Sequence, residues 1–135
     1  MGCGAPTTRG TSNGDLRGAA SELGTYARSL CRARTRVSGY FGSELFRDPA
    51  MSILLDLFAS EEEGKVVSST SCAGVAGVSL TTTLRYIHML EEENLVSRHP
   101  DKSDGRRIIV KLTDRARTAV ARMLSDFRAL ALPQS

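Results

Sequence analysis

The residues with the clearest chemistry lie on a segment, Leu80 to about Glu93, that we expect to form a helix. Ser79 directly precedes this segment. Hydroxyl, guanidinium and imidazole groups occupy its outward positions, at Thr81, Thr82, Arg85 and His88. Such side chains at a helix N-terminus can contact base edges in a DNA major groove or phosphates, and Arg pairs bidentately with guanine. The same residues also suit an ordinary polar surface helix, and the helix alone does not separate the two interpretations.

A basic turn after this helix adds a second group of candidates. Leu95–His99 and Arg107–Leu112 are typical of two strands, and the turn between them is rich in Pro, Asp, Ser and Gly. Its candidate DNA-contacting residues are Lys102, Asp104, Arg106 and Arg107. An Arg at a hairpin tip suits the negative potential of a narrow minor groove, and Asp104 could hold the guanidinium of Arg106 in a fixed direction. The alternative role of Asp104 is that of a simple turn residue.

The elements before and within this segment predict a helix-turn-helix. Ser68 begins a short helix, Gly77-Val78 forms the turn, and Ser79 caps the second helix. Asn94 follows at a position that favours the left-handed conformation. The inward side chains of the two helices are expected to be Cys72, Ala73, Ala76, Thr83, Ile87 and Leu90.

Two further helices are predicted upstream. Apolar residues at three- and four-residue steps predict a helix from about Asp15 to Val37, broken by Gly39 and Gly42. Asp48 as N-cap and Pro49 at the first position start another, which ends near Ser60 and precedes a short strand at 65–67. Its expected apolar stripe is Ala50, Ile53, Leu54, Leu57 and Phe58. The apolar residues between the helices, expected to dock on the core, are Tyr40, Phe41, Leu45 and Phe46.

Thr113 is expected to cap a final helix from Asp114 to about Leu130. Its apolar stripe is Ala116, Val120, Met123, Leu124, Phe127 and Leu130. The first and last helices could pack together and continue across a two-fold axis, or could cover only their own domain. We favour the dimer.

The totals place the chain among single-domain proteins. It has 135 residues and a formal net charge of +3, with basic residues clustered at 28–36 and 98–117. We expect a disordered tail at 1–14 and one domain at 15–135, with a core at 46–113 flanked by helices within 15–45 and 114–131. No apolar run is long enough to cross a bilayer, so no membrane partner is expected.

The side chains that could support catalysis or redox chemistry are few. His88 and His99 lie without Cys or carboxylate at ligand spacing, and no phosphate-binding loop or nucleophile elbow is present, so we expect no metal, no cofactor and no enzyme activity. The three cysteines lack framework spacing and suggest reduced thiols. Cys31 is a candidate redox residue because the nearby Arg28, Arg32 and Arg34 could lower its pKa.

The segment from about Phe46 to Ala121, a little over half of the chain, resembles the MarR family of bacterial winged-helix regulators. The resemblance depends on the order and spacing of Leu90 to Val96, Arg98, Asp104-Gly105-Arg106 and Leu112-Thr113. Departures are Asn94 and Ala116 where Gly is usual, Leu80 where a polar residue is common, and one C-terminal helix where many members have two. The long first helix is therefore an alternative site of dimerisation.

The resemblance implies a mainly α fold with a small β-hairpin wing, flanked by N- and C-terminal dimerisation helices. It implies a homodimer that binds a pseudo-palindromic operator in double-stranded DNA, with a small-molecule effector in some cases. Thr81, Thr82 and Arg85 would read bases, Arg106 would enter the minor groove, and Asp104 would orient it. The protein would be cytoplasmic and associated with a bacterial nucleoid. The alternative function is a winged-helix adaptor that binds protein, for which Leu80, Leu84 and Met89 would be suited.

Overall fold

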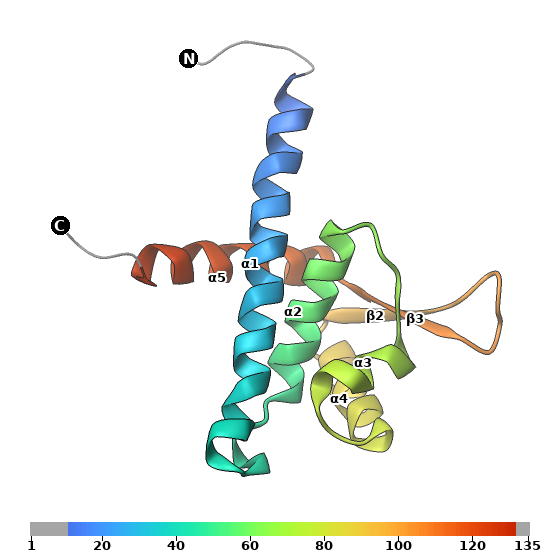
Figure 1. The fold of residues 1–135 in the computed structure, drawn as a ribbon. Helices are drawn as coiled ribbons and strands as arrows, with labels where there is room; N and C mark the ends of the chain where they lie inside the picture. Colours follow the sequence, from blue (N-terminus) through green and yellow to red (C-terminus); the bar gives the residue numbers. More distant parts are fainter. Residues whose placement is uncertain (1–10, 132–135) are drawn as a thin grey trace.

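The computed structural model describes residues 11–131, with side chains from residue 22 onward. The elements in chain order are α1 (Thr11–Phe41), the 3-10 helix η1 (Glu44–Phe46), α2 (Pro49–Glu62), β1 (Val67–Ser68), α3 (Ser69–Ala76), α4 (Leu80–Glu92), β2 (Val96–Pro100), β3 (Ile108–Leu112) and α5 (Asp114–Ala131). Figure 1 shows α2 between α1 on one side and α3 with α4 on the other, and the β2–β3 hairpin projecting beyond them.

Helix α1 is longer than the sequence pattern indicated. It begins at Thr11, so residues 11–14 are helical and not part of a tail, while residues 1–10 lie outside the described residues. It also continues through Gly39 and ends at Phe41, because one glycine is tolerated inside a helix at a modest cost. Gly42, with φ of +61°, ends it, and its N–H donates to the carbonyl of Ser38 at 2.8 Å.

Helix α1 lies very close to α2 at Gly24. A Cβ atom at that position would lie 2.7 Å from the Cβ of Glu62, so a side chain there would push the helices apart. One turn later, Arg28 donates to Asp56, to Ser60 at 3.1 Å and to Glu63 at 3.1 Å. Close backbone approach and this polar network together fix α1 against α2.

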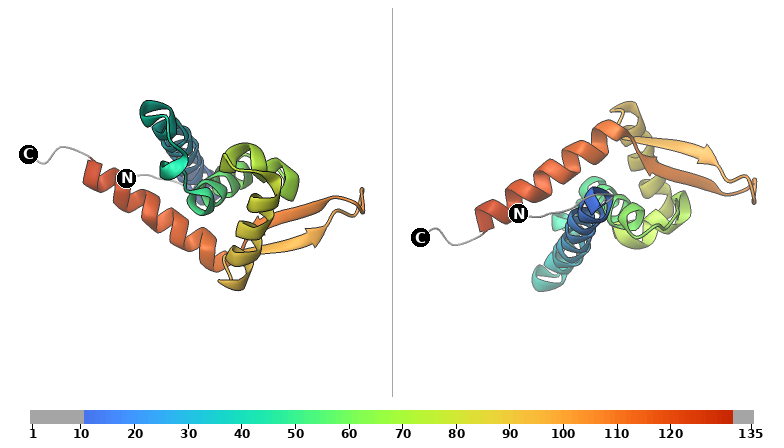
Figure 2. Two further views of the ribbon diagram at one scale, coloured as in Figure 1. Left: turned by 90° about the horizontal axis from the view of Figure 1, so that it is seen from below. Right: turned by 90° about the horizontal axis from the view of Figure 1, so that it is seen from above.

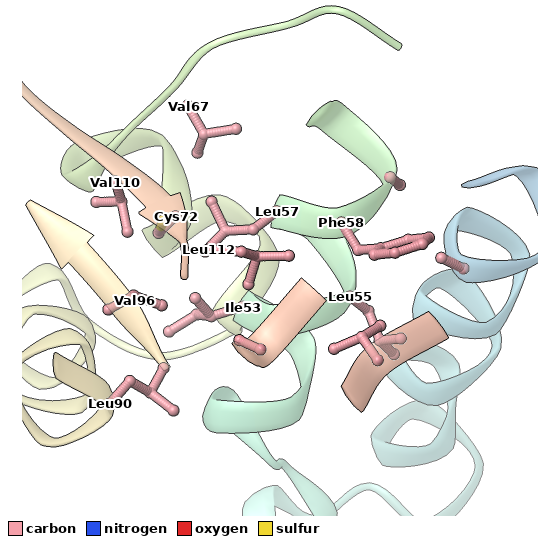
Figure 3. Close-up of a cluster of buried hydrophobic side chains, with 14 of the residues drawn as sticks. Ile53, Leu55, Leu57, Phe58, Val67, Cys72, Leu90, Val96, Val110 and Leu112 are labelled. Carbon is pink, nitrogen blue, oxygen red and sulfur yellow. The ribbon is translucent and has the colours of Figure 1, made fainter. Parts of the chain in front are cut away.

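Helix α2 is the centre of the core. Asp48 accepts from the N–H of Met51 at 3.2 Å, which confirms the predicted cap. Burial is not confined to the expected stripe: Leu55 is fully buried, whereas Ala50 and Leu54 are only half-buried. The reason is that α2 packs against α1, α3, α4, β3 and α5. Figure 3 shows its side chains between the hairpin and α1.

The apolar residues at the corner between α1 and α2 do not dock on the core, so this prediction is wrong. Tyr40, Phe41 and Leu45 are 81%, 65% and 83% exposed, and Phe46 is exposed too. The rings of Phe41 and Phe46 lie 4.7 Å apart and cover each other and not the core. We call this surface the aromatic corner. It arises because α1 extends past the core before Gly42 turns the chain back.

The sheet has three antiparallel strands in the order β1-β3-β2. The predicted hairpin is confirmed, with Val96 opposite Leu112, and the short strand after α2 pairs Val67 with Val110. Ile109 and Val110 are both buried, whereas Ile108 is only half-buried, because β1 pairs with β3 at Ile109 and Val110.

Helix α5 begins as predicted, with the N–H of Ala116 donating to the hydroxyl of Thr113 at 3.1 Å. Its first turns are buried through Ala116, Val120 and Leu124. Farther along, Phe127 and Leu130 are exposed, so the predicted stripe is covered only over its first part.

Candidate nucleic-acid interface

The first turn of α4 is fixed by its cap. The hydroxyl of Ser79 accepts from the N–H of Thr82 at 3.1 Å, and the hydroxyl of buried Thr83 donates to the Ser79 carbonyl at 2.8 Å. Ile87 and Leu90 are buried on the same side as Thr83, as predicted. The inward face therefore sets which side chains of α4 point to solvent.

The outward side of α4 holds most of the predicted contact residues. Thr81, Arg85 and His88 are exposed, and within the described residues Arg85 has no ion-pair partner. Thr82 is half-buried, and its hydroxyl accepts from that of Ser79 at 3.0 Å. The imidazole of His88 lies 3.6 Å from Glu92. Thr81 and Arg85 are consequently the more available groups, while Ser79 and Thr82 are used in the cap.

The turn of the hairpin is held by its own hydrogen bonds. The N–H of Asp101 donates to the carbonyl of Arg107, and the N–H of Arg107 donates to that of Asp104, both at 2.9 Å. The side chain of Arg107 also pairs with Asp101 at 3.1 Å. Hydrogen bonds from Ser103, reinforced by Arg107, lower the pKa of Asp101. The charge of Arg107 is thus partly neutralised by Asp101 within the wing.

Arg106 and Asp104 lie together at the tip of the wing. The Arg106 side chain is 95% exposed and its Nε lies 3.5 Å from Asp104 Oδ1. The backbone N–H of Arg106 donates to the same oxygen at 3.1 Å. Lys102 is exposed nearby and has no ion-pair partner within residues 11–131. The tip therefore presents two cations to solvent.

Arg98 connects the wing to α4. Its guanidinium donates to Glu91 at 2.7 Å and 3.0 Å, and these hydrogen bonds lower the pKa of Glu91. Glu91 lies on α4 and Arg98 on β2, so the pair helps to fix the angle between the two candidate contact elements.

The sequence did not indicate that Arg47 lies at the surface formed by α4 and the turn before it. Its Nη1 would lie 3.4 Å from a Cβ atom placed on Gly77, the left-handed residue that ends α3 just before α4. The sequence Phe46-Arg47-Asp48-Pro49 indicated only a helix start. Nothing local in it could indicate that this cation lies beside the helix-turn-helix turn.

The basic cluster on α1 is divided by the fold. Arg28 binds Asp56 of α2 and Glu63 directly after it, and Arg34 binds Asp48 at 2.8 Å. Arg32 and Arg36 are exposed and have no ion-pair partner in the described part of the chain. Half of the cluster thus stabilises the fold, and only the other half remains for an external partner.

The expected low pKa of Cys31 is wrong. The thiol is buried, and burial, with Asp56 adding to the effect, raises its pKa, while the opposing effects of Arg28 and Arg34 are smaller. Burial also raises the pKa of Cys72 to about 12. A redox role for Cys31 remains an untested prediction and has lost its supporting argument.

Among the described side chains, residues 22–131, no three His, Cys, Asp or Glu gather as a metal site requires. None of the helices within residues 11–131 combines the length and apolar character of a bilayer crossing. A cavity of about 770 Å³ lies between α1, α2 and α3, with Arg28, Arg32, Arg36 and Lys65 in its lining.

A helix-turn-helix followed by a two-stranded wing, whose β3 also pairs with β1, defines a winged-helix protein. The sequence matches no protein-family model and no curated protein. Solved structures do match it. The protein AF1382 of Archaeoglobus fulgidus aligns with a TM-score of 0.56 and 21% identity, over 66% of this chain and 94% of that one.

Two regulators match over more of this chain. PcaV of Streptomyces coelicolor, solved with its natural ligand, has a TM-score of 0.51 and 25% identity, over 77% of this chain and 70% of its own. MepR of S. aureus, solved with DNA, has a TM-score of 0.51 and 18% identity, over 76% and 71%. The chain therefore has the winged-helix fold of MarR-type regulators, which confirms the predicted mainly α fold with a small hairpin wing.

Proposed function

We propose that this protein is a sequence-specific regulator of transcription that binds double-stranded DNA. The observation that carries the proposal is the pair formed by α4 and the wing, which Arg98 and Glu91 hold together. The outward face of α4 presents Thr81 and Arg85, which have no side-chain partner among the described residues, and the tip of the wing presents exposed Arg106. The MarR-type fold, which MepR uses in a complex with DNA, supports it.

In this proposal α4 enters the major groove and the wing tip reaches the adjacent minor groove. Thr81 and Arg85 contact base edges, with Thr82 and His88 beside them, and Arg106 enters the minor groove with Asp104 beside it. Lys102, Arg107 and Ser79 contribute contacts to the phosphates. A homodimer would place two such units about one helical turn apart on a pseudo-palindromic operator.

The proposal extends to an effector. PcaV was solved with its natural ligand, and the cavity between α1, α2 and α3 in this chain offers a volume of about 770 Å³. A ligand there would contact both the flanking helix α1 and the helix-turn-helix. We propose a cytoplasmic, bacterial regulator without enzyme activity.

The second candidate is an adaptor that uses the winged helix to bind protein. The observation that favours it is the exposure of Leu80, Leu84 and Met89 on α4. Such side chains on an otherwise polar helix suit a protein partner as well as DNA.

Fluorescence anisotropy on random-sequence duplex DNA at low and high salt separates the two functions. A DNA-binding regulator binds at micromolar protein in low salt and loses affinity steeply as salt rises, because phosphate contacts release counterions. Absence of salt-sensitive binding would reject the DNA-binding function and favour the adaptor.

A further inference from the structure

Two leucines lie on the helix that the proposed function inserts into the major groove. Leu80 and Leu84 are 44% and 41% exposed, although the inward face of α4 is already filled by Thr83, Ile87 and Leu90. They are four residues apart, so they lie one above the other on one side of the helix. Each directly precedes an exposed polar candidate, Thr81 and Arg85 respectively.

Scattered exposed leucines are common and need no explanation by themselves. What matters here is their surroundings. Arg85 beside them has no ion-pair partner in the described part of the chain, and the wing adds Lys102 and Arg106. The apolar pair thus lies beside an available cation on the helix that precedes the basic wing, which favours a polyanion as the partner.

A protein partner fits this position less well. Specific protein interfaces cover about 800 Å² on each partner around an apolar centre, and two half-exposed leucines supply little of that. The aromatic corner exposes more apolar surface in one place, through Tyr40, Phe41 and Leu45. If the molecule binds a protein through an apolar patch, that corner is the better candidate.

One apolar group is available in the major groove, namely the C5-methyl group of thymine. We propose that Leu80 and Leu84 contact thymine methyl groups, so that the protein selects thymine beside the bases contacted by Thr81 and Arg85. This inference rests on the proposed function. It assigns to the leucines a role in choosing the sequence beside Thr81 and Arg85, whereas the wing supplies charge.

Deoxyuridine replacement tests the inference, because uracil keeps the hydrogen-bonding edges of thymine and lacks only its methyl group. A tight-binding duplex is selected from a random library with the wild-type protein, then resynthesised with deoxyuridine at each thymidine in turn. Burial of one methyl group corresponds to about a fourfold change in affinity. We expect such a loss for wild type at one or more positions.

The Leu84→Ala variant should bind the thymidine and deoxyuridine duplexes equally at the position that Leu84 contacts, and Leu80→Ala should do so at its own. Met89→Ala is the matched control, since Met89 is also 41% exposed on α4 but lies in its last turns. It should retain the wild-type discrimination. Circular dichroism and thermal melting establish that each variant is folded.

Two outcomes would overturn the inference while leaving the proposed function intact. One is salt-sensitive binding by wild type that no deoxyuridine substitution weakens. The other is an equal loss on substitution in wild type, Leu80→Ala and Leu84→Ala. A failure of the wild-type protein to select any duplex is a different result, because it rejects DNA binding itself.

Discussion

At the scale of single residues, Arg106 is the side chain whose position is most informative. Its guanidinium is almost wholly exposed at the end of a hairpin, and its nearest partner is Asp104 at 3.5 Å. An exposed pair of this kind contributes little to folding stability. The proposed role of Arg106 is therefore a contact with DNA, and its substitution should weaken DNA binding more than it lowers folding stability.

We expect Arg106→Ala to weaken binding to all duplexes and to lower the slope of log affinity against log salt by about one, because the minor groove loses one cation and the counterion release that this cation drives. Anisotropy titrations at several salt concentrations measure this. Arg122→Ala, which removes an exposed Arg of α5, is the control and should behave as wild type. An unchanged salt slope in Arg106→Ala would show that the wing assignment is wrong.

The buried cysteines give a second prediction at this scale. Folding raises the pKa of Cys31 and that of Cys72, the latter to about 12. The contribution of the two buried thiols to the free energy of unfolding is therefore fully present below the pKa of an unfolded cysteine. It is lost as the pH rises toward the pKa of the folded state. In a Cys3→Ser background at pH 8, neither thiol should react with an aromatic disulfide reagent until denaturant is added. Fast labelling of Cys31 in the native protein would revive the redox hypothesis.

At the scale of elements, Glu61 joins three parts of the core. One carboxylate oxygen accepts from the backbone N–H of Leu112 at 2.9 Å, and the other accepts from Arg117 at 2.7 Å. Hydrogen bonding to Glu61 raises the pKa of Arg117. The end of α2 is thereby tied to β3 and to α5.

Glu61→Ala should lower the free energy of unfolding by about 1–3 kcal/mol, because the part-buried N–H of Leu112 loses its partner. Urea denaturation followed by circular dichroism, at fixed protein concentration, measures the change. Glu61→Gln keeps an oxygen for that N–H and should lose less stability. Equal stability of the alanine variant and wild type would mean that the contact is dispensable.

At the scale of the whole molecule, two flanking helices lie beside the winged-helix core. α1 and α5 are in contact, and the outer end of α5 exposes Phe127 and Leu130. Figure 2 shows that this end of α5 and the hairpin project in opposite directions. A two-fold axis near the end of α5 would leave both wings and both α4 helices free to contact DNA.

We expect the protein to sediment as a dimer and the double variant Phe127→Asp, Leu130→Asp to sediment as a monomer, because charges would replace the apolar contact. Sedimentation velocity over a range of concentrations distinguishes these states. Leu45→Asp, at the aromatic corner, is the matched control and should remain dimeric. A monomer in the control and a dimer in the double variant would move the interface to the corner.

Several features of the fold were predictable because they depend on residues close together in the chain. Asp48, Ser79 and Thr113 cap helices through partners within three or four residues. Asn94, with φ of +60°, ends α4 at the predicted position. The Asp104–Arg106 pair is equally local, so the sequence was sufficient to place it at the wing tip.

Other features depend on which distant surfaces meet, and the sequence alone could not determine them. Cys31 is buried and Tyr40 exposed because of where α1 meets α2 and where it extends past it. Arg47 lies beside Gly77 through the path of the chain between these helices. The sequence by itself determined the helix ends and the chemistry of α4 and the wing, since capping and turn formation are local. Only the tertiary structure decided which charges and thiols are buried, because burial is set by contacts between elements far apart in the chain.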